Sequence, residues 1–144
     1  MIPKRIPEEE FKYIYSKVPR LCVDIIIQSD HGVILSKRMI PPFKGMWHIP
    51  GGTVLNREKL EATAKRVALE ELGLDIEINK LLGLIEYPEM DDEKHAVSIA
   101  YLITDFSGTP RGSNQGKEVK FFQELPENLI PAQKEFLEEH LEMK

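Results

Sequence analysis

The sequence predicts one domain of the α/β (α+β) class, in which helices pack on the faces of a mixed β-sheet. Its 144 residues lie near the commonest size of a single domain, and a chain of that length buries roughly two thirds of its unfolded surface. Apolar residues make up 42% and charged residues 30%, which excludes disordered, collagen-like and disulfide-stapled proteins. The expected strands and helices do not alternate regularly, and this argues against a doubly wound nucleotide-binding fold. We expect residues 1–144 to form this domain, with residues 1–20 as an N-terminal helical extension.

The first half of the chain predicts one short helix followed by strands. Residues 8–17 carry apolar side chains at helical spacing behind an acidic start. Two runs rich in β-branched residues, 21–28 and 33–39, flank the turn-forming residues 29–32 and predict a hairpin. The remaining elements of this half are a loop, a short strand and a sharp backbone bend over residues 41–45, 46–49 and 50–52.

The second half predicts a central helix, three strands and a final helix. Apolar spacing indicates a helix over residues 59–72, closed by Gly73 in the position that glycine favours after a helix. Pro131 stands where proline is preferred, in the first turn of the last helix. The three strands are expected over residues 81–87, 96–105 and 119–123. The polar stretch 107–117 has no periodicity, and ordered loops of that length are often functional.

Charge and cysteine content restrict the partners and the compartment. The sequence contains 24 Asp and Glu residues and 19 Lys and Arg residues, which gives a formal charge of −5. We therefore expect no nucleic-acid partner and only local binding of phosphate. The lone Cys22 has no disulfide partner and is expected to be a small packed side chain. No run approaches the roughly 18 to 20 apolar residues that span a bilayer. We therefore expect a cytoplasmic protein without membrane association.

A carboxylate stands on the apolar face of the predicted central helix. At about 100° per residue, the residues that share a narrow arc are Leu60, Ala64 and Val67. Glu71 falls in the same arc, and burying an unpaired carboxylate is costly, so it must be neutralised, paired or bound to a metal. Glu70 lies close enough to address the same cation, and Mg²⁺ prefers oxygen ligands. The alternative is that Glu71, in the last turn, reaches water through fraying.

The sequence around this helix resembles the Nudix box, G-x5-E-x7-R-E-U-x-E-E-x-G-U, in which U is aliphatic. The fixed positions that match are Gly52, Glu58, Arg66, Glu70, Glu71 and Gly73. The spacing is intact, and Trp47-x-x-Pro50-Gly51 precedes it. A Gly-Gly pair alone is usually a turn, whereas six positions at these intervals are specific.

The resemblance implies an α/β/α sandwich hydrolase that acts on nucleoside diphosphates linked to another moiety, with Mg²⁺ or Mn²⁺ at the box helix. It implies that Glu70 and Glu71 are catalytic metal ligands and that the Gly51 carbonyl is a further ligand. The structural positions of the box would be Gly52, Glu58, Arg66 and Gly73. Of these, Arg66 would orient a carboxylate and Glu58 would hold the loop against the helix. A metal that bridges two phosphate oxygens allows a net acidic protein to bind an anion.

One position departs from the box. The family usually has Glu directly after the Arg, where this chain has Val67. A Glu there would share a helix face with Glu71 and complete a cluster of three carboxylates, whereas two carboxylates more naturally hold one ion. This argues against ordinary water attack at phosphorus. The same departure resembles the GDP-mannose mannosyl hydrolase branch, which cleaves the C–O bond between sugar and phosphate.

Other positions are similar to that branch: Asp24 in the first long strand, the pair Lys37-Arg38 before a Pro-containing loop, and Trp47 before Pro-Gly-Gly. The resemblance implies that Arg38 supports the departing diphosphate, with a weaker contribution from Lys37. Asp24 contacts a substrate hydroxyl or base, or makes a structural hydrogen bond. Phe43 is the better candidate for stacking on a nucleobase, because Trp47 is more typical of a core.

The branch also uses a Gln-His pair in its late loop, with the Gln on the metal and the His as the base that activates water. Gln115 keeps the proposed ligand position, but Gly116 stands where the base is expected. The substitutes are Glu118, His95 and His48, and the sequence does not rank them.

These residues favour Mg²⁺-dependent hydrolysis of a small-molecule nucleotide, first of all a nucleoside diphosphate sugar cleaved in the manner of GDP-mannose mannosyl hydrolase. The alternative within enzymes is pyrophosphohydrolysis of a nucleoside triphosphate or an ADP-ribose-type compound. Val67 and Gly116 also leave open a non-catalytic nucleotide-sensing domain, and a helix that binds no metal is the last alternative. The resemblance is compatible with a homodimer.

Overall fold

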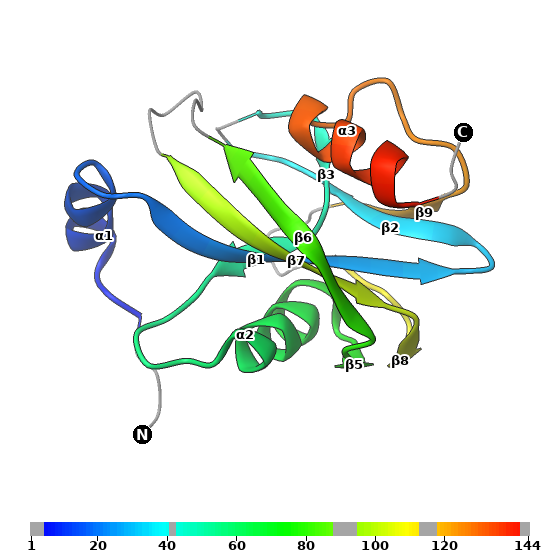
Figure 1. Ribbon diagram of the computed structural model, residues 1–144, viewed down its shortest axis with the longest axis horizontal. Coiled ribbons are helices and arrows are strands. Elements are labelled where there is room, and N and C mark those ends of the chain that lie inside the picture. Colours follow the sequence, from blue (N-terminus) through cyan, green and yellow to red (C-terminus); the bar gives the residue numbers. More distant parts are fainter. Residues whose placement is uncertain (1–4, 41–42, 88–94, 113–117, 142–144) are drawn as a thin grey trace.

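The computed structural model describes residues 5–40, 43–87, 95–112 and 118–141, and its centre is a seven-stranded mixed sheet (Figure 1). The long strands β1 (Arg20–Ser29) and β7 (Ala96–Ile103) are neighbours and run parallel. The other strands of this sheet are β2 (Gly32–Lys37), β3 (Trp47–His48), β4 (Gly51–Thr53), β6 (Lys80–Tyr87) and β9 (Val119–Phe122). The order is β3-β2-β1-β7-β6, with β4 paired to β1 and β9 to β2. These further pairs are antiparallel, so the prediction of a mixed sheet is confirmed.

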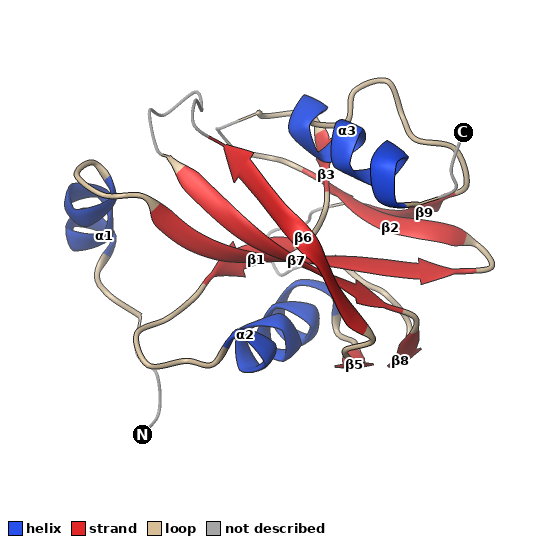
Figure 2. Cartoon of the chain, in the orientation of Figure 1, coloured by secondary structure: helices blue, strands red, loops and turns tan. Residues whose placement is uncertain are grey.

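Helices cover both faces of the sheet, as an α/β/α sandwich requires (Figure 2). Ala64 and Val67 of α2 (Leu60–Val67) close the core on one face, and Phe136 and Leu137 of α3 (Pro131–His140) close the core on the other. The third helix, α1 (Glu8–Tyr15), buries none of its residues. No helix in the described ranges combines the length and apolarity needed to cross a membrane.

Strand β1 is buried on both faces, which explains its almost continuous apolar sequence. Successive side chains of a strand point to opposite faces. Cys22 and Ile26 therefore join the core under α3, whereas Val23 and Ile25 join the core under α2. Asp24 has the same parity as Cys22 and Ile26, so it interrupts the α3 side of the strand and needs polar partners there.

The hairpin predicted around residues 29–32 is confirmed, since Ser29 of β1 pairs with Gly32 of β2. The central helix differs from the prediction of residues 59–72. It is α-helical only over α2 and continues as a π-helical turn, η1 (Ala68–Leu72). A π-helical turn holds more residues than an α-helical one, so the regular helical wheel fails for the last turn. Glu71 is half-buried there instead of lying on a fully buried stripe.

Two further differences concern short strands. The bend predicted at residues 50–52 is the beginning of β4, in which Gly51 and Gly52 pair with Asp24 and Val23 of β1. The strands β5 (Asp75–Glu77) and β8 (Asp105–Ser107) form a separate two-stranded ladder that the sequence did not indicate. Strands of three residues are too short to display a period of two.

Candidate active site

Residues of the box motif form a hydrogen-bonded cluster that joins the loop after β4 to α2. Nε of Arg66 donates to Oε2 of Glu58 at 2.8 Å, and Nη2 donates to Oε1 of Glu58 at 3.0 Å and to the Thr53 carbonyl oxygen at 2.8 Å. Oε1 of Glu58 also accepts from the Thr63 hydroxyl and the Leu55 N–H. The Glu58 side chain is 4% exposed, and hydrogen bonds from Arg66 lower its pKa to about 2. These hydrogen bonds tie the loop that contains Thr53 and Leu55 to α2.

Gly73 ends the helix in the left-handed conformation that glycine tolerates best, with φ +69°. A Cβ atom at this position would lie 2.6 Å from Nε of Arg111. The Arg111 N–H donates to the Leu72 carbonyl oxygen at 2.9 Å. Gly73 therefore allows the segment that contains Arg111 to pack against the end of the box helix.

The carboxylates of the box line a cleft of about 510 Å³, here called the carboxylate cleft. Both oxygens of Glu70 accept from Nη2 of Arg5, at 2.6 and 2.8 Å, and Oε1 also accepts from Nη1 of Arg66 at 2.9 Å. Partial burial raises the pKa of Glu70, but these hydrogen bonds outweigh it and the net shift is downward. Glu71 is half-buried in the same cleft. The wall that α1 contributes consists of Phe11, Ile14 and Tyr15.

The donors in the carboxylate cleft fit a hard divalent cation. Gly51 and Gly52 line the cleft together with Glu70 and Glu71, so carboxylate and backbone oxygens are available in one space. Within the described residues, no group of three or more His, Cys, Asp or Glu side chains forms a metal site. Val67, 1% exposed, occupies the position at which a third carboxylate would stand. Glu70 and Glu71 are thus the acidic side chains that line this cleft among the described residues.

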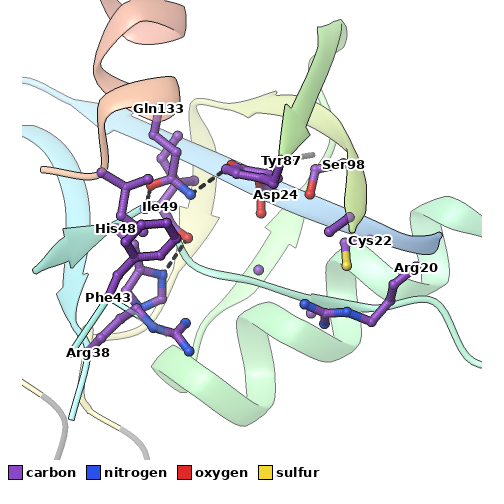
Figure 3. Close-up of a pocket in the computed structure, with 14 residues that line it drawn as sticks. Arg20, Cys22, Asp24, Arg38, Phe43, His48, Ile49, Tyr87, Ser98 and Gln133 are labelled. Atoms are coloured by element: carbon purple, nitrogen blue, oxygen red, sulfur yellow. Dashed lines mark hydrogen bonds between the residues drawn. The ribbon is translucent and has the colours of Figure 1, made fainter. Parts of the chain in front are cut away.

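A second cleft of about 100 Å³, here called the polar cleft, shares Gly51 and Gly52 with the first. Figure 3 shows side chains from several strands and from the start of α3 around it. Its polar lining includes Arg20, Asp24, Arg38, His48, Tyr87 and Ser98. The two glycines are thus the common wall between acidic groups on one side and a cationic, hydrogen-bonding cleft on the other.

Asp24 lies in the polar cleft and is 6% exposed. Its Oδ2 accepts from the Tyr87 hydroxyl at 2.9 Å. Burial raises the pKa of Asp24 to about 6, although hydrogen bonds from Tyr87 and Ser98 and the charge of Arg20 act in the opposite direction. A Cβ atom on Gly51 would overlap Oδ1 of Asp24. Gly51 is therefore required for close approach of the two strands and not for a bend.

The structure brings three predicted substrate-binding residues together, since Asp24, Arg38 and Phe43 all line the polar cleft. Phe43 has a left-handed backbone, with φ +61°. Lys37 is half-buried at the end of β2 and is not among the residues that line either cleft. Trp47 packs in the core, as expected.

The substitutes for the absent base occupy different places. His48 lines the polar cleft, with Nδ1 2.8 Å from a backbone carbonyl oxygen. Glu118 is exposed and pairs with a lysine of β9 at 3.3 Å, and the half-buried His95 does not line either cleft. The proposed metal ligand Gln115 and the neighbouring Gly116 lie outside the described residues.

Sequence patterns did not single out several residues of the two clefts, namely Arg5, Arg20, Tyr87, Ser98 and Gln133. Arg5 and Tyr87 reach their partners across long stretches of chain, which no local pattern reports. One signal was available for Gln133, because it is a polar residue among the apolar Ile130, Phe136 and Leu137 at helical spacing. A buried polar residue on such a face requires a hydrogen-bond partner.

Known proteins resemble this chain over most of its length. The NUDIX domain family matches residues 18–142. The low-salt glycan biosynthesis protein Agl8 of Haloferax volcanii is 36% identical over 140 residues, which cover 93% of this chain and 90% of that protein. The ADP-ribose pyrophosphatase of Methanocaldococcus jannaschii is 35% identical over 111 residues, which cover 77% of this chain and 66% of that protein.

Solved structures share the fold. The MutT NUDIX hydrolase from Burkholderia pseudomallei superimposes with a TM-score of 0.78 at 32% identity, covering 85% of this chain and 98% of that one. The NUDIX domain of Shewanella oneidensis NrtR, solved with ADP ribose, has a TM-score of 0.62 at 23% identity, covering 81% and 83% of the two chains. The second likeness is one of fold alone.

Proposed function

The chain belongs to the Nudix hydrolase family, and we propose that its substrate is a nucleoside diphosphate sugar, hydrolysed with Mg²⁺ or Mn²⁺. The observation that carries the proposal is that the carboxylate cleft and the polar cleft meet at Gly51 and Gly52. A diphosphate held across this boundary would have metal ligands on one side and Arg38 on the other. The name of the Haloferax relative, a glycan biosynthesis protein, supports a sugar among the nucleoside diphosphate derivatives on which the family acts.

In this proposal Glu70, Glu71 and the Gly51 carbonyl hold the metal, with Gln115 as a further ligand from outside the described residues. When bound, the ion neutralises phosphate oxygens and stabilises charge on the departing diphosphate. The Arg38 guanidinium binds two phosphate oxygens at once, because its planar fork matches their geometry.

The remaining residues bind the rest of the substrate. Lys37, beside Arg38 in the chain, adds a weaker attraction for phosphate. Phe43 offers an aromatic face to the nucleobase from within the polar cleft. Asp24 accepts a hydrogen bond from a hydroxyl or N–H group. These are the contacts from which selectivity for base and sugar would arise.

The bond that we propose is broken is the C–O bond between sugar and phosphate. Val67 is the observation that favours this reaction, because it replaces the carboxylate that a multi-metal site for attack at phosphorus would use. The second candidate is pyrophosphohydrolysis at phosphorus, which the similarity to an ADP-ribose pyrophosphatase favours. The two reactions differ in their products and in where the oxygen of water ends.

The test is hydrolysis of GDP-mannose, UDP-glucose, ADP-ribose and dGTP with Mg²⁺ in ¹⁸O-labelled water. From the nucleotide sugars GDP-mannose or UDP-glucose we expect a nucleoside diphosphate and a free sugar that carries the ¹⁸O label. A nucleoside monophosphate and a labelled phosphate product would instead establish the second candidate.

The matched variants are Glu71→Gln and Glu70→Gln, with Glu61→Gln on the exposed side of α2 as the control. We expect loss of turnover in the first two and unchanged turnover in the control. Nucleotide binding without turnover in the unaltered protein would contradict the proposal and favour a sensing domain.

A further inference from the structure

A chain of buried hydrogen bonds ends on Asp24 (Figure 3). The Ile49 N–H donates to Oε1 of Gln133 at 2.6 Å, and Nε2 of Gln133 donates to the Tyr87 oxygen at 2.9 Å. The Tyr87 hydroxyl donates to Oδ2 of Asp24 at 2.9 Å. Gln133, Tyr87 and Asp24 are 4%, 8% and 6% exposed, respectively. These hydrogen bonds thus link α3, β6 and β1 through side chains that are almost fully buried.

The direction of this chain is determined by its first member. A backbone N–H can only donate, so the oxygen of the Gln133 amide must face Ile49 and its nitrogen must face Tyr87. The Tyr87 oxygen accepts that hydrogen bond and has one proton to donate, which goes to Asp24. Oδ2 of Asp24 is therefore held as an acceptor, and a reversal would leave a buried donor or acceptor unsatisfied.

The second oxygen of Asp24 lies against Gly51, where the two clefts meet. Oδ1 occupies the space that a Cβ atom on Gly51 would need, and Gly51 lines both clefts. Ser98, from β7, lines the polar cleft beside Asp24 and lowers the pKa of its carboxyl. With Oδ2 engaged by Tyr87, the carboxylate cannot rotate freely, and Oδ1 keeps its direction at the boundary between the clefts.

We propose that Tyr87 and Gln133 are positioning residues that hold the Asp24 carboxylate as a hydrogen-bond acceptor for a donor group of the substrate. This rests on the proposed function and specifies the chemistry that the polar cleft selects. The donor is an O–H or N–H group, supplied either by the sugar or by the nucleobase. A phosphate oxygen is excluded at this point, because it would face the carboxylate with like charge.

The first test is a double-mutant cycle on the binding of GDP-mannose, measured by calorimetry at one pH. We expect Tyr87→Phe, Gln133→Met and Asp24→Asn each to weaken binding at least threefold, and Tyr87→Phe to have no further effect in the Asp24→Asn protein, because Tyr87 acts through the Asp24 carboxylate. Tyr101→Phe is the matched control, since Tyr101 is a buried tyrosine of the other core. An effect of Tyr87→Phe that is equally large with and without the Asp24 carboxylate would overturn the proposal.

The second test repeats this cycle with GDP. A purely structural role of Tyr87 would weaken the binding of either ligand independently of Asp24, and would overturn the proposal. An effect of Tyr87→Phe through Asp24 on both ligands assigns the donor to the guanosine half, and an effect on GDP-mannose alone assigns it to the sugar.

The two proposals fail separately. If neither GDP-mannose nor GDP binds, the proposed substrate class is wrong, and the cycle with ADP-ribose or dGTP decides whether Tyr87 acts through Asp24; if none of these binds, both proposals are rejected. If GDP-mannose binds and the effects of Tyr87→Phe and Asp24→Asn add, the substrate class stands and the positioning role is rejected.

Discussion

Asp24 and Gly51 face one another across β1 and β4, and Oδ1 of the aspartate fills the space that a side chain at residue 51 would occupy. A Cβ atom there would also lie 2.8 Å from the Val23 carbonyl oxygen. The glycine therefore serves two purposes. It leaves backbone atoms exposed in the carboxylate cleft, and it leaves space for the Asp24 carboxylate in the polar cleft.

The first prediction concerns Gly51→Ala. The added methyl group meets backbone and a buried carboxylate that cannot move away, so we expect destabilisation by about 1–3 kcal/mol and a loss of hydrolysis larger than the loss of stability explains. Urea unfolding and kcat/KM check the two effects. Gly83→Ala is the control, because its nearest neighbour is the movable Phe136 ring at 3.3 Å. Equal effects of the two substitutions on hydrolysis would contradict the argument.

The second prediction concerns Glu58→Gln and pH. Because the pKa of Glu58 is lowered from 4.5 to about 2 on folding, its ionised form stabilises the protein above pH 4.5, and this contribution disappears as the pH falls toward 2. We expect Glu58→Gln to cost about 1–3 kcal/mol near neutral pH, with the difference shrinking across that window. Urea unfolding between pH 2.5 and 6.5 measures it, with the exposed Glu61→Gln as the control. A difference that stays constant with pH would exclude the ionised pair as its cause.

The third prediction concerns Val67→Glu. In the absence of metal the new carboxylate would be buried without a cation, and we expect destabilisation by roughly 2–4 kcal/mol. Val67 lines the carboxylate cleft with Glu70 and Glu71, so Mn²⁺ should restore stability and bind in greater number than in the unaltered protein. Thermal melting and Mn²⁺ binding by electron paramagnetic resonance measure these effects. Val67→Gln should be destabilised without such rescue, and equal rescue of both variants would contradict the placement of the site.

The fourth prediction concerns Arg5→Gln. Arg5 engages both oxygens of Glu70, so a metal that uses Glu70 must displace it. Removing the competing Arg5 guanidinium should strengthen Mn²⁺ binding about three- to tenfold. An exposed ion pair contributes about 0.2–1 kcal/mol, and one of good geometry contributes somewhat more. Lys12→Gln, which removes a different ion pair of the same segment, is the control. Unchanged Mn²⁺ affinity in Arg5→Gln would mean that Glu70 does not bind the ion.

The sequence by itself was sufficient for the mixed sheet, the hairpin and the box motif. The hairpin and the box motif depend on neighbours in the chain, and the mixed sheet was predicted from the order of the strands and helices. The almost continuous apolar run of β1 reflects its burial on both faces. The cluster of Glu58 and Arg66 joins residues only eight positions apart. Such short separations leave a pattern in the sequence, because one helix and its preceding loop contain all the participants.

Only the tertiary structure decided how the clefts are built. Tyr87 and Asp24 are 63 positions apart, Gln133 and Tyr87 46, and Arg5 and Glu70 65. The first two pairs meet because β1 and β6 lie in one sheet, with β7 between them, and α3 packs over that sheet. Arg5 meets Glu70 because the segment before α1 passes the end of the box helix. The sequence also did not predict the π-helical turn that carries Glu70 and Glu71, because regular helical spacing assumes a constant number of residues per turn. Contacts of this kind are selected by the packing of the whole domain, and no local preference encodes them.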